Sequence, residues 1–173
     1  MSVSEKLKRL SKDIPDHITL VAVSKTKPDA LIMELYDAGH RDFGENKVQD
    51  MVAKQERLPE EIRWHMVGHL QSNKVKYIAP FVHMIHSVDS LKLLKVINKE
   101  GDKNNRVIDC LLQVHIARES TKFGLDEQEL HELLASDIIS TLKNVRIRGL
   151  MGMATFTDDR EQIRSEFQVL KNI

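Results

Sequence analysis

Short apolar runs alternate with segments of helical periodicity along the whole chain. Runs rich in β-branched residues predict strands, and apolar residues spaced three or four apart predict helices between them. Six strands are expected within residues 20–24, 41–44, 63–68, 81–88, 107–116 and 145–153. This strict alternation predicts an α/β fold with a parallel sheet.

Turn and capping residues set the expected helix boundaries. The first helix begins near Ser4 and is closed by Pro15, and the second is capped by Asp29 and ends at Gly39. Asp89 or Ser90 is expected to cap the helix after the fourth strand, ahead of a polar loop at residues 100–106. Capping-box spacing is present in the pairs Asp126 with Glu129 and Asp158 with Glu161.

Chemically distinctive residues follow the carboxyl end of nearly every expected strand. Open doubly wound sheets gather such residues at one switch point, whereas a barrel spreads them around its rim. We therefore expect one domain, residues 1–173, with the fold of a TIM-type (β/α) barrel. Such a barrel closes with eight strands, so the last two strand-helix units are missing from this sequence.

Composition excludes several classes of protein. The 26 basic and 26 acidic side chains leave no net charge for a polyanion, so nucleic-acid binding is not expected. Cys110 is the single cysteine, which rules out a disulfide framework and a multi-cysteine metal site. The amino terminus lacks a signal-peptide core, and no apolar run is long enough to span a bilayer. We expect a cytoplasmic protein.

The candidate reactive group is Lys25, at the end of the first apolar strand. Lys27 is two residues further on and would point to the same side while the chain stays extended, until Pro28 ends the strand. Desolvation and a neighbouring cation both lower the pKa of a lysine, and a neutral amine attacks aldehydes. The pattern indicates a Schiff-base lysine, with a solvated strand end as the alternative.

The histidines do not have a convincing metal-ligand pattern. His65 and His69 are four apart, but Gly68 and a change from strand to loop separate them, so no metal site is expected. His83, His86 and His115 lie in expected strands, where a hydrogen-bonded core histidine is the usual role.

Three further positions carry two interpretations each. Asn46 is either a helix cap or an amide directed at a ligand. The group Ser120, Thr121 and Lys122 is either a solvated loop or an anion site. Met151 and Met153 either fill the core or line a flat aromatic ligand.

Four collinear motifs resemble the pyridoxal phosphate homeostasis proteins. They are AVSKTKP at residues 22–28, FGEN at 43–46, WHMVGHLQSNK at 64–74 and GLM at 149–151. The resemblance implies a barrel related to the N-terminal domain of alanine racemase. It also implies pyridoxal 5′-phosphate as cofactor, held as an aldimine on Lys25, with Asn46 beside its ring and His65 and Met151 lining the pocket.

The resemblance also implies residues that this sequence does not supply. Family members continue with a serine- and glycine-containing segment that holds the phosphate, and then an arginine that meets the pyridine nitrogen. Neither matches anything in residues 1–173. An open barrel ending at Ile173 would expose strand edges, retain cofactor weakly and tend to aggregate.

Three functions are compared on this basis. The resemblance favours a carrier that buffers pyridoxal phosphate without substantial catalysis and delivers it to apoenzymes that depend on it. A racemase needs a base on each face of the cofactor, and alanine racemase takes its second base from a further domain. A cofactor-free Schiff-base aldolase would need an acid-base relay that the sequence does not display. The expected state is a monomer or a weak dimer.

Overall fold

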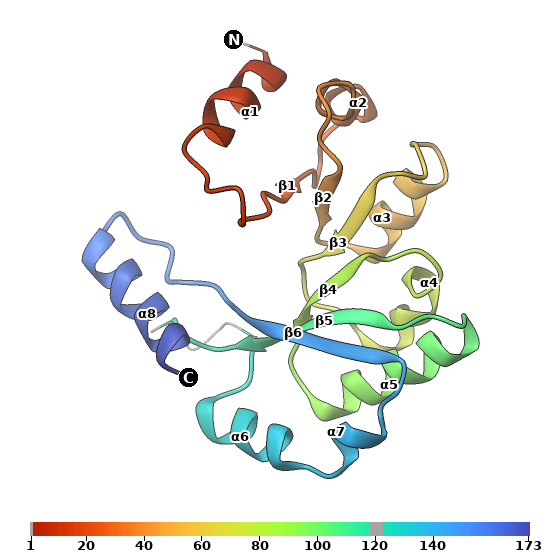
Figure 1. Ribbon diagram of the computed structural model, residues 1–173, viewed down its shortest axis with the longest axis vertical. Coiled ribbons are helices and arrows are strands. Elements are labelled where there is room, and N and C mark those ends of the chain that lie inside the picture. The colour runs from red at the N-terminus through yellow and green to blue at the C-terminus, as the bar shows by residue number, and fades with distance from the viewer. Residues whose placement is uncertain (1, 118–122) are drawn as a thin grey trace.

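The computed structural model describes residues 2–117 and 123–173. Six parallel strands form one sheet in the order β1-β2-β3-β4-β5-β6, so each new strand joins beside the one before it. Figure 1 shows this sheet bent into an arc, with helices along its outer side and with α1 and α8 at its two ends. The strand order and the curvature match a TIM-type barrel wall, as the sequence predicts.

The strands are short and lie close to their expected positions. Their bounds are β1 Ala22–Val23, β2 Asp42–Glu45, β3 Arg63–Met66, β4 Met84–Val88, β5 Ile108–Val114 and β6 Val145–Gly152. The helices are α1 Val3–Ser11, α2 Asp29–Asp37, α3 Val48–Gln55, α4 Val75–Ile78, α5 Leu91–Lys103, α6 Glu127–Ala135, α7 Ile138–Thr141 and α8 Arg160–Asn172, with a 3₁₀ turn, η1, at Ser72–Lys74.

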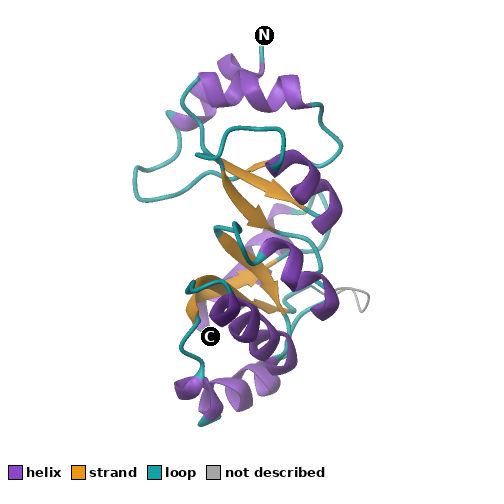
Figure 2. Ribbon diagram, turned by 90° about the vertical axis from the view of Figure 1, so that its right-hand side faces the viewer, coloured by secondary structure: helices purple, strands orange, loops and turns teal. Residues whose placement is uncertain are grey.

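The hydrophobic core lies between the sheet and the helices on its outer side. Figure 2 shows helices in front of the strands on this side of the molecule. Phe43, Trp64 and Ile85 point outward from adjacent strands and are almost completely buried against side chains such as Met51 and Leu94. Because side chains alternate along a strand, the residues between these point to the opposite, concave face. Gly44, His65 and Met84 form one row across that face.

Several expected boundaries are confirmed by local hydrogen bonds. Ser90 accepts a hydrogen bond from the Leu93 amide and caps α5, and Asp126 with Glu129 forms the expected capping box of α6. Gly39 follows α2 with a φ of 94°, the left-handed conformation that glycine tolerates.

Other boundaries were wrong by one to four residues. The first helix ends at Ser11, before Pro15, and the cap of α8 is Asp159 in place of Asp158. Helix α5 continues through the expected loop to Lys103, and the cap of α2 is Pro28 in place of Asp29. These differences arise because helix ends depend on tertiary contacts as well as on local capping chemistry.

Candidate functional site

Lys25 lies in a tight turn directly after β1. The Lys27 amide donates to the Ser24 carbonyl oxygen (3.0 Å), and Thr26 takes a left-handed φ of 59°. The chain is therefore not extended from Lys25 to Lys27, and the expected same-side placement of these lysines was wrong. Both lysine side chains are exposed, so the expected desolvation of Lys25 is also absent. No carboxylate among the described residues pairs with Lys25, which leaves its amine open to a ligand.

A buried network holds the backbone in front of Lys25. Lys54, from α3, donates to the Ser24 carbonyl oxygen (2.8 Å) and to Glu45 Oε1 (2.6 Å), and Ser24 Oγ donates to the same carboxylate oxygen (2.6 Å). Glu45 is completely buried and Lys54 is 7% exposed. The second oxygen of Glu45 is buried and has no hydrogen-bond partner among the residues that the structure describes. The hydrogen bonds that join Lys54, Ser24 and Glu45 Oε1 hold the end of β1 against helix α3.

Asn46 follows β2 at the same edge of the sheet. The cap residue of α3 is Lys47, so the interpretation of Asn46 as a helix cap was wrong. None of the described residues hydrogen-bonds to the Asn46 side chain, which is half-buried. A Cβ on Gly68, after β3, would lie 2.3 Å from the Asn46 backbone oxygen. Only a glycine lets these two strand ends approach so closely.

His65 lies deeper in the concave face, within a chain of polar contacts. Its Nε2–H donates to Asp42 Oδ1 (3.1 Å), and its Nδ1 lies 2.8 Å from His86 Nε2. Arg63 donates to both Asp42 oxygens, at 2.7 and 2.5 Å. His65 is therefore a hydrogen-bonded interior histidine, only 3% exposed, opposite Gly44 of β2.

Burial and charge set the protonation of this cluster. Burial raises the pKa of Asp42, but hydrogen bonds from Arg63 and His65 outweigh it and lower that pKa to about 2. Burial lowers the pKa of His65, against the opposing effect of Asp42. Burial, with the charges of His65 and His83, lowers the pKa of His86 to about 4. At neutral pH the cluster therefore holds one carboxylate and neutral imidazoles.

The remaining histidines have varied surroundings. His83 is exposed, so its assignment to the core was wrong. His69 stacks on Phe123, with ring centres 4.1 Å apart, and pairs with Asp89 at 3.4 Å. His115 is half-buried at the end of β5.

Met151 lies near the end of β6, opposite Gln113 of β5. Its neighbour Leu150 packs on the core beside the helices, so Met151 faces the concave side. This placement is compatible with a pocket-lining role, whereas Met153 is exposed beyond the strand. The group Ser120, Thr121 and Lys122 lies outside the described residues.

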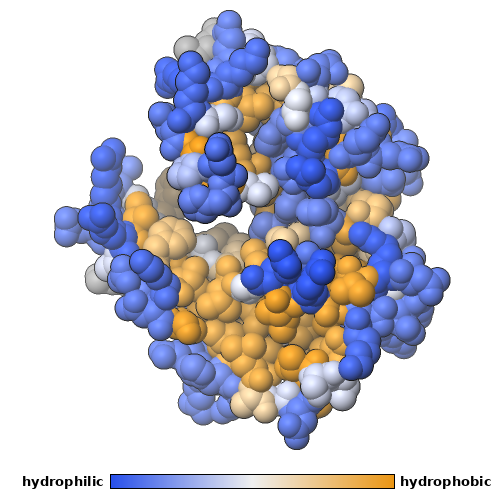
Figure 3. All heavy atoms as spheres, viewed as in Figure 1, coloured by the Kyte–Doolittle hydropathy of each residue, from blue (hydrophilic) through white to orange (hydrophobic). Residues whose placement is uncertain are grey.

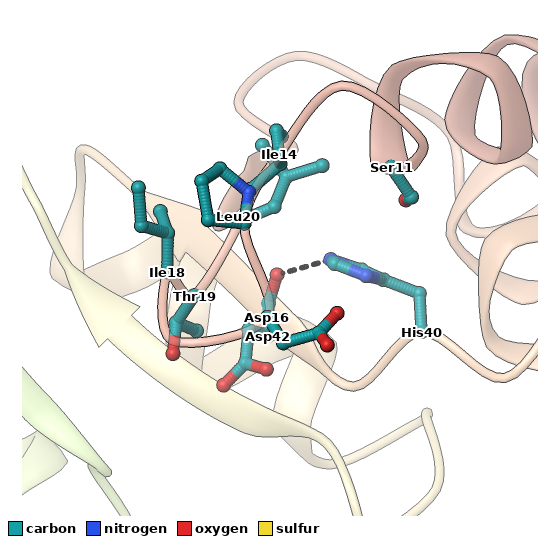
Figure 4. A pocket seen from close by; sticks show the side chains of 9 residues that line it. Ser11, Ile14, Asp16, Ile18, Thr19, Leu20, His40 and Asp42 are labelled. Carbon is teal, nitrogen blue, oxygen red and sulfur yellow. Dashed lines mark hydrogen bonds between the residues drawn. The ribbon is translucent and has the colours of Figure 1, made fainter.

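Lys25 lies away from the cavity drawn in Figure 4. That cavity, of about 320 Å³, lies between the segment joining α1 to β1 and the start of β2. Within it, His40 Nε2–H donates to the Asp42 carbonyl oxygen (2.8 Å). Its lining is at the amino ends of the strands, whereas Lys25 and Asn46 follow their carboxyl ends.

The residues at the carboxyl edge fit an aldehyde-bearing ligand. Lys25 supplies an exposed amine, and Lys54 fixes the backbone that precedes it. Asn46 supplies a side-chain amide after the next strand. Neither side chain has a hydrogen-bond partner among the described residues, and the concave face between β1 and β6 is open. Sequence reasoning missed Glu45, Lys54 and Asp42. Their acidic and basic side chains are typical of solvated surfaces, and only the packing of distant segments reveals their burial.

The fold and this lysine define a barrel-type α/β protein with an amine at the end of its first strand. The family model for the N-terminal domain of alanine racemase matches residues 2–173. A pyridoxal phosphate homeostasis protein of Aquifex aeolicus is 38% identical over 155 residues, which cover 89% of this chain and 67% of that protein. The homologue from Escherichia coli K12 is 37% identical over 163 residues, covering 92% and 68%. The chain belongs to the family of pyridoxal phosphate homeostasis proteins.

Solved structures agree with this assignment. PipY of Synechococcus elongatus PCC7942, a structure with PLP bound, aligns with a TM-score of 0.89 and 35% identity over 99% of this chain and 79% of PipY. An alanine racemase of Clostridium difficile 630 aligns with a TM-score of 0.75 and 10% identity, over 97% of this chain and 45% of the racemase. At that identity the racemase supports the fold alone.

Two further sequence expectations concern the cysteine and the membrane. Cys110 is a buried thiol on β5, and burial, followed by the charge of Asp109, raises its pKa to about 12. None of the described helices has the length and apolar character needed to cross a bilayer.

Proposed function

We propose that this protein binds pyridoxal 5′-phosphate through Lys25 and takes part in intracellular pyridoxal phosphate homeostasis. The observation that carries this proposal is the Lys25 amine, which is exposed, has no carboxylate partner within residues 2–117 and 123–173, and follows a Ser24 carbonyl fixed by Lys54. Family membership and the PLP bound in PipY support the choice of ligand.

Each residue has a distinct part in this binding. Pyridoxal phosphate supplies an aldehyde that reacts reversibly with a primary amine. Lys25 offers that amine, while Lys54 and Glu45 keep its backbone in place. The Asn46 amide can orient a ring by hydrogen bonding, Met151 lines the concave face, and His65 forms part of its floor.

We infer a carrier role in place of catalysis. Racemisation needs a second base, and the two tyrosines of the chain lie on helices away from the concave face. Tyr36 donates to Glu61 (3.1 Å), and Tyr77 is exposed on α4. Reversible attachment suits delivery to cytoplasmic apoenzymes, and a monomer or weak dimer suffices for it. The lone buried thiol of Cys110 is compatible with a reducing compartment.

The first test is covalent attachment. We expect the chain mixed with pyridoxal phosphate to gain visible absorbance, and borohydride reduction followed by peptide mass mapping to find the adduct on Lys25. Lys25→Ala should lose this adduct completely because the reacting amine is gone. Lys27→Ala, an exposed lysine in the same turn, is the matched control and should keep it. The same adduct yield in Lys25→Ala and the parent chain would contradict the assignment.

The second test separates carrier from enzyme. The loaded chain incubated with L-alanine should form no D-alanine above the rate of free pyridoxal phosphate, as measured by chiral chromatography. Faster racemisation that disappears in Lys25→Ala would establish a racemase and would refute the carrier role.

A further inference from the structure

Asp42, His65 and His83 bring three potential metal-ligand atoms together on the concave face. These atoms all lie within 4.8 Å of one another, and Asp42 Oδ1 is 3.1 Å from His65 Nε2. The rings of His65 and His83 have centres 5.1 Å apart. We propose that these three side chains bind a divalent transition-metal ion of the zinc type. Two imidazoles and a carboxylate are a donor set that zinc readily accepts.

The three side chains come from separate segments that the sheet holds in register. Asp42 begins β2, His65 is in β3, and His83 immediately precedes β4. Asp42 and His65 are 6% and 3% exposed, so neither side chain has freedom to move away. The His83 amide donates to the Trp64 carbonyl oxygen (2.8 Å), which fixes the third residue beside the other two.

The site is also open to an ion and to the water that would complete its coordination. A cavity of about 340 Å³ is bordered by all three residues and by Thr19, Met84 and His86. Zinc sites with three protein ligands leave a further position for water.

His86 supplies the support that a metal-bound histidine needs. Asp42 is ionised and accepts the His65 Nε2 proton, so His65 Nδ1 accepts a hydrogen bond from His86 Nε2. When a metal takes Nε2, the proton moves to Nδ1 and His86 becomes the acceptor through its other tautomer. No proton is released, and the second nitrogen of His65 stays bonded in both states.

Arg63 competes with the metal for the carboxylate of Asp42. Its guanidinium bonds both oxygens, but its side chain is 48% exposed and can turn outward. Because of this competition, we expect the parent chain to bind the metal with moderate affinity, and we expect Arg63→Met to bind it more tightly. A general loss of folding cannot produce that increase.

The test is calorimetric titration of the full chain with Zn²⁺, repeated with Co²⁺ to record the visible spectrum of the bound ion. We expect one ion per chain. His83→Ala should weaken affinity more than about tenfold, because loss even of a supporting partner costs a metal site 10- to 100-fold. Arg63→Met should strengthen it several-fold, and His131→Ala, an exposed histidine on α6, should leave it unchanged.

Circular dichroism of each variant confirms that the fold is retained. The metal site is refuted if the parent chain shows no saturable binding up to about 1 mM Zn²⁺. It is equally refuted if His83→Ala and the parent bind Zn²⁺ alike. Because no pyridoxal phosphate is present, either result is independent of the Lys25 assignment.

Discussion

Lys54 is buried in this protein, whereas Lys25 is exposed. Sequence reasoning expected burial at Lys25, because it follows an apolar run. The structure buries Lys54 because α3 packs over the ends of β1 and β2, where Glu45 Oε1 and the Ser24 carbonyl oxygen each accept a hydrogen bond from its ammonium group. A buried charge is tolerated only with such partners.

Substitution of Lys54 should therefore have a large effect on stability. Lys54→Met removes the cation that pairs with the fully buried Glu45 carboxylate, so we expect the free energy of unfolding to fall by about 3–5 kcal/mol. Urea unfolding measures this loss.

A surface ion pair provides the matched control. Arg57 pairs with Asp29 at 2.9 Å, but both side chains are largely accessible to water. Arg57→Met should cost no more than about 1 kcal/mol. Equal losses in Lys54→Met and Arg57→Met would show that the Glu45 pair is screened like a surface pair.

At the scale of elements, the carboxyl edge depends on how closely neighbouring strand ends approach. Strand β1 has only two paired residues, and the turn after it contains a threonine at a positive φ. The next contact, between the loops after β2 and β3, has room for no side chain at Gly68. The close contact with Gly68 therefore sets the position of the Asn46 backbone.

Gly68→Ala should displace the Asn46 backbone and destabilise the fold. The added methyl group would lie 2.3 Å from a backbone oxygen, so we expect a loss of about 3 kcal/mol in the free energy of unfolding. Gly39→Ala is the control, since its φ is positive but its surroundings are empty, and it should lose only about 1 kcal/mol. Urea unfolding of both variants measures these losses. If Gly68→Ala lost less stability than Gly39→Ala, a steric contact at Gly68 would be excluded.

At the scale of the molecule, the strands differ in how many residues pair them to the rest of the sheet. Strand β1 pairs through two residues, and no residue of α1 is fully buried. Strand β5 pairs with β6 along its whole length, and with β4 at Asp109, Cys110 and Leu112. Figure 3 shows apolar side chains gathered over the lower part of one face, around β6, where no strand residue is fully buried. The sheet therefore holds β5 more firmly than it holds β1.

Amide hydrogen exchange followed by mass spectrometry should reveal this difference. We expect peptides from α1 and β1 to exchange at least tenfold faster than peptides from β5, because local opening there breaks few buried contacts. Helix α5, packed on the core, is the internal reference for a protected segment. Equal protection in β1 and β5 would mean that the chain opens only as a whole.

The sequence by itself determined the order of the helices and strands and the place of Lys25 after the first strand. Hydrophobic periodicity is a local property, so all six strands and the capping box of α6 could be predicted, whereas the cap of α8 and the single helical turn α7 could not. The tertiary structure alone decided which polar residues are buried. Asp42 meets Arg63 and His65 from the next strand, and Lys54 of α3 meets the Ser24 carbonyl oxygen, and no local pattern encodes such contacts. The proposed role of Lys25 was inferred from its place in the chain, but the support behind it and the proposed metal site exist only because neighbouring strands and α3 bring distant side chains together.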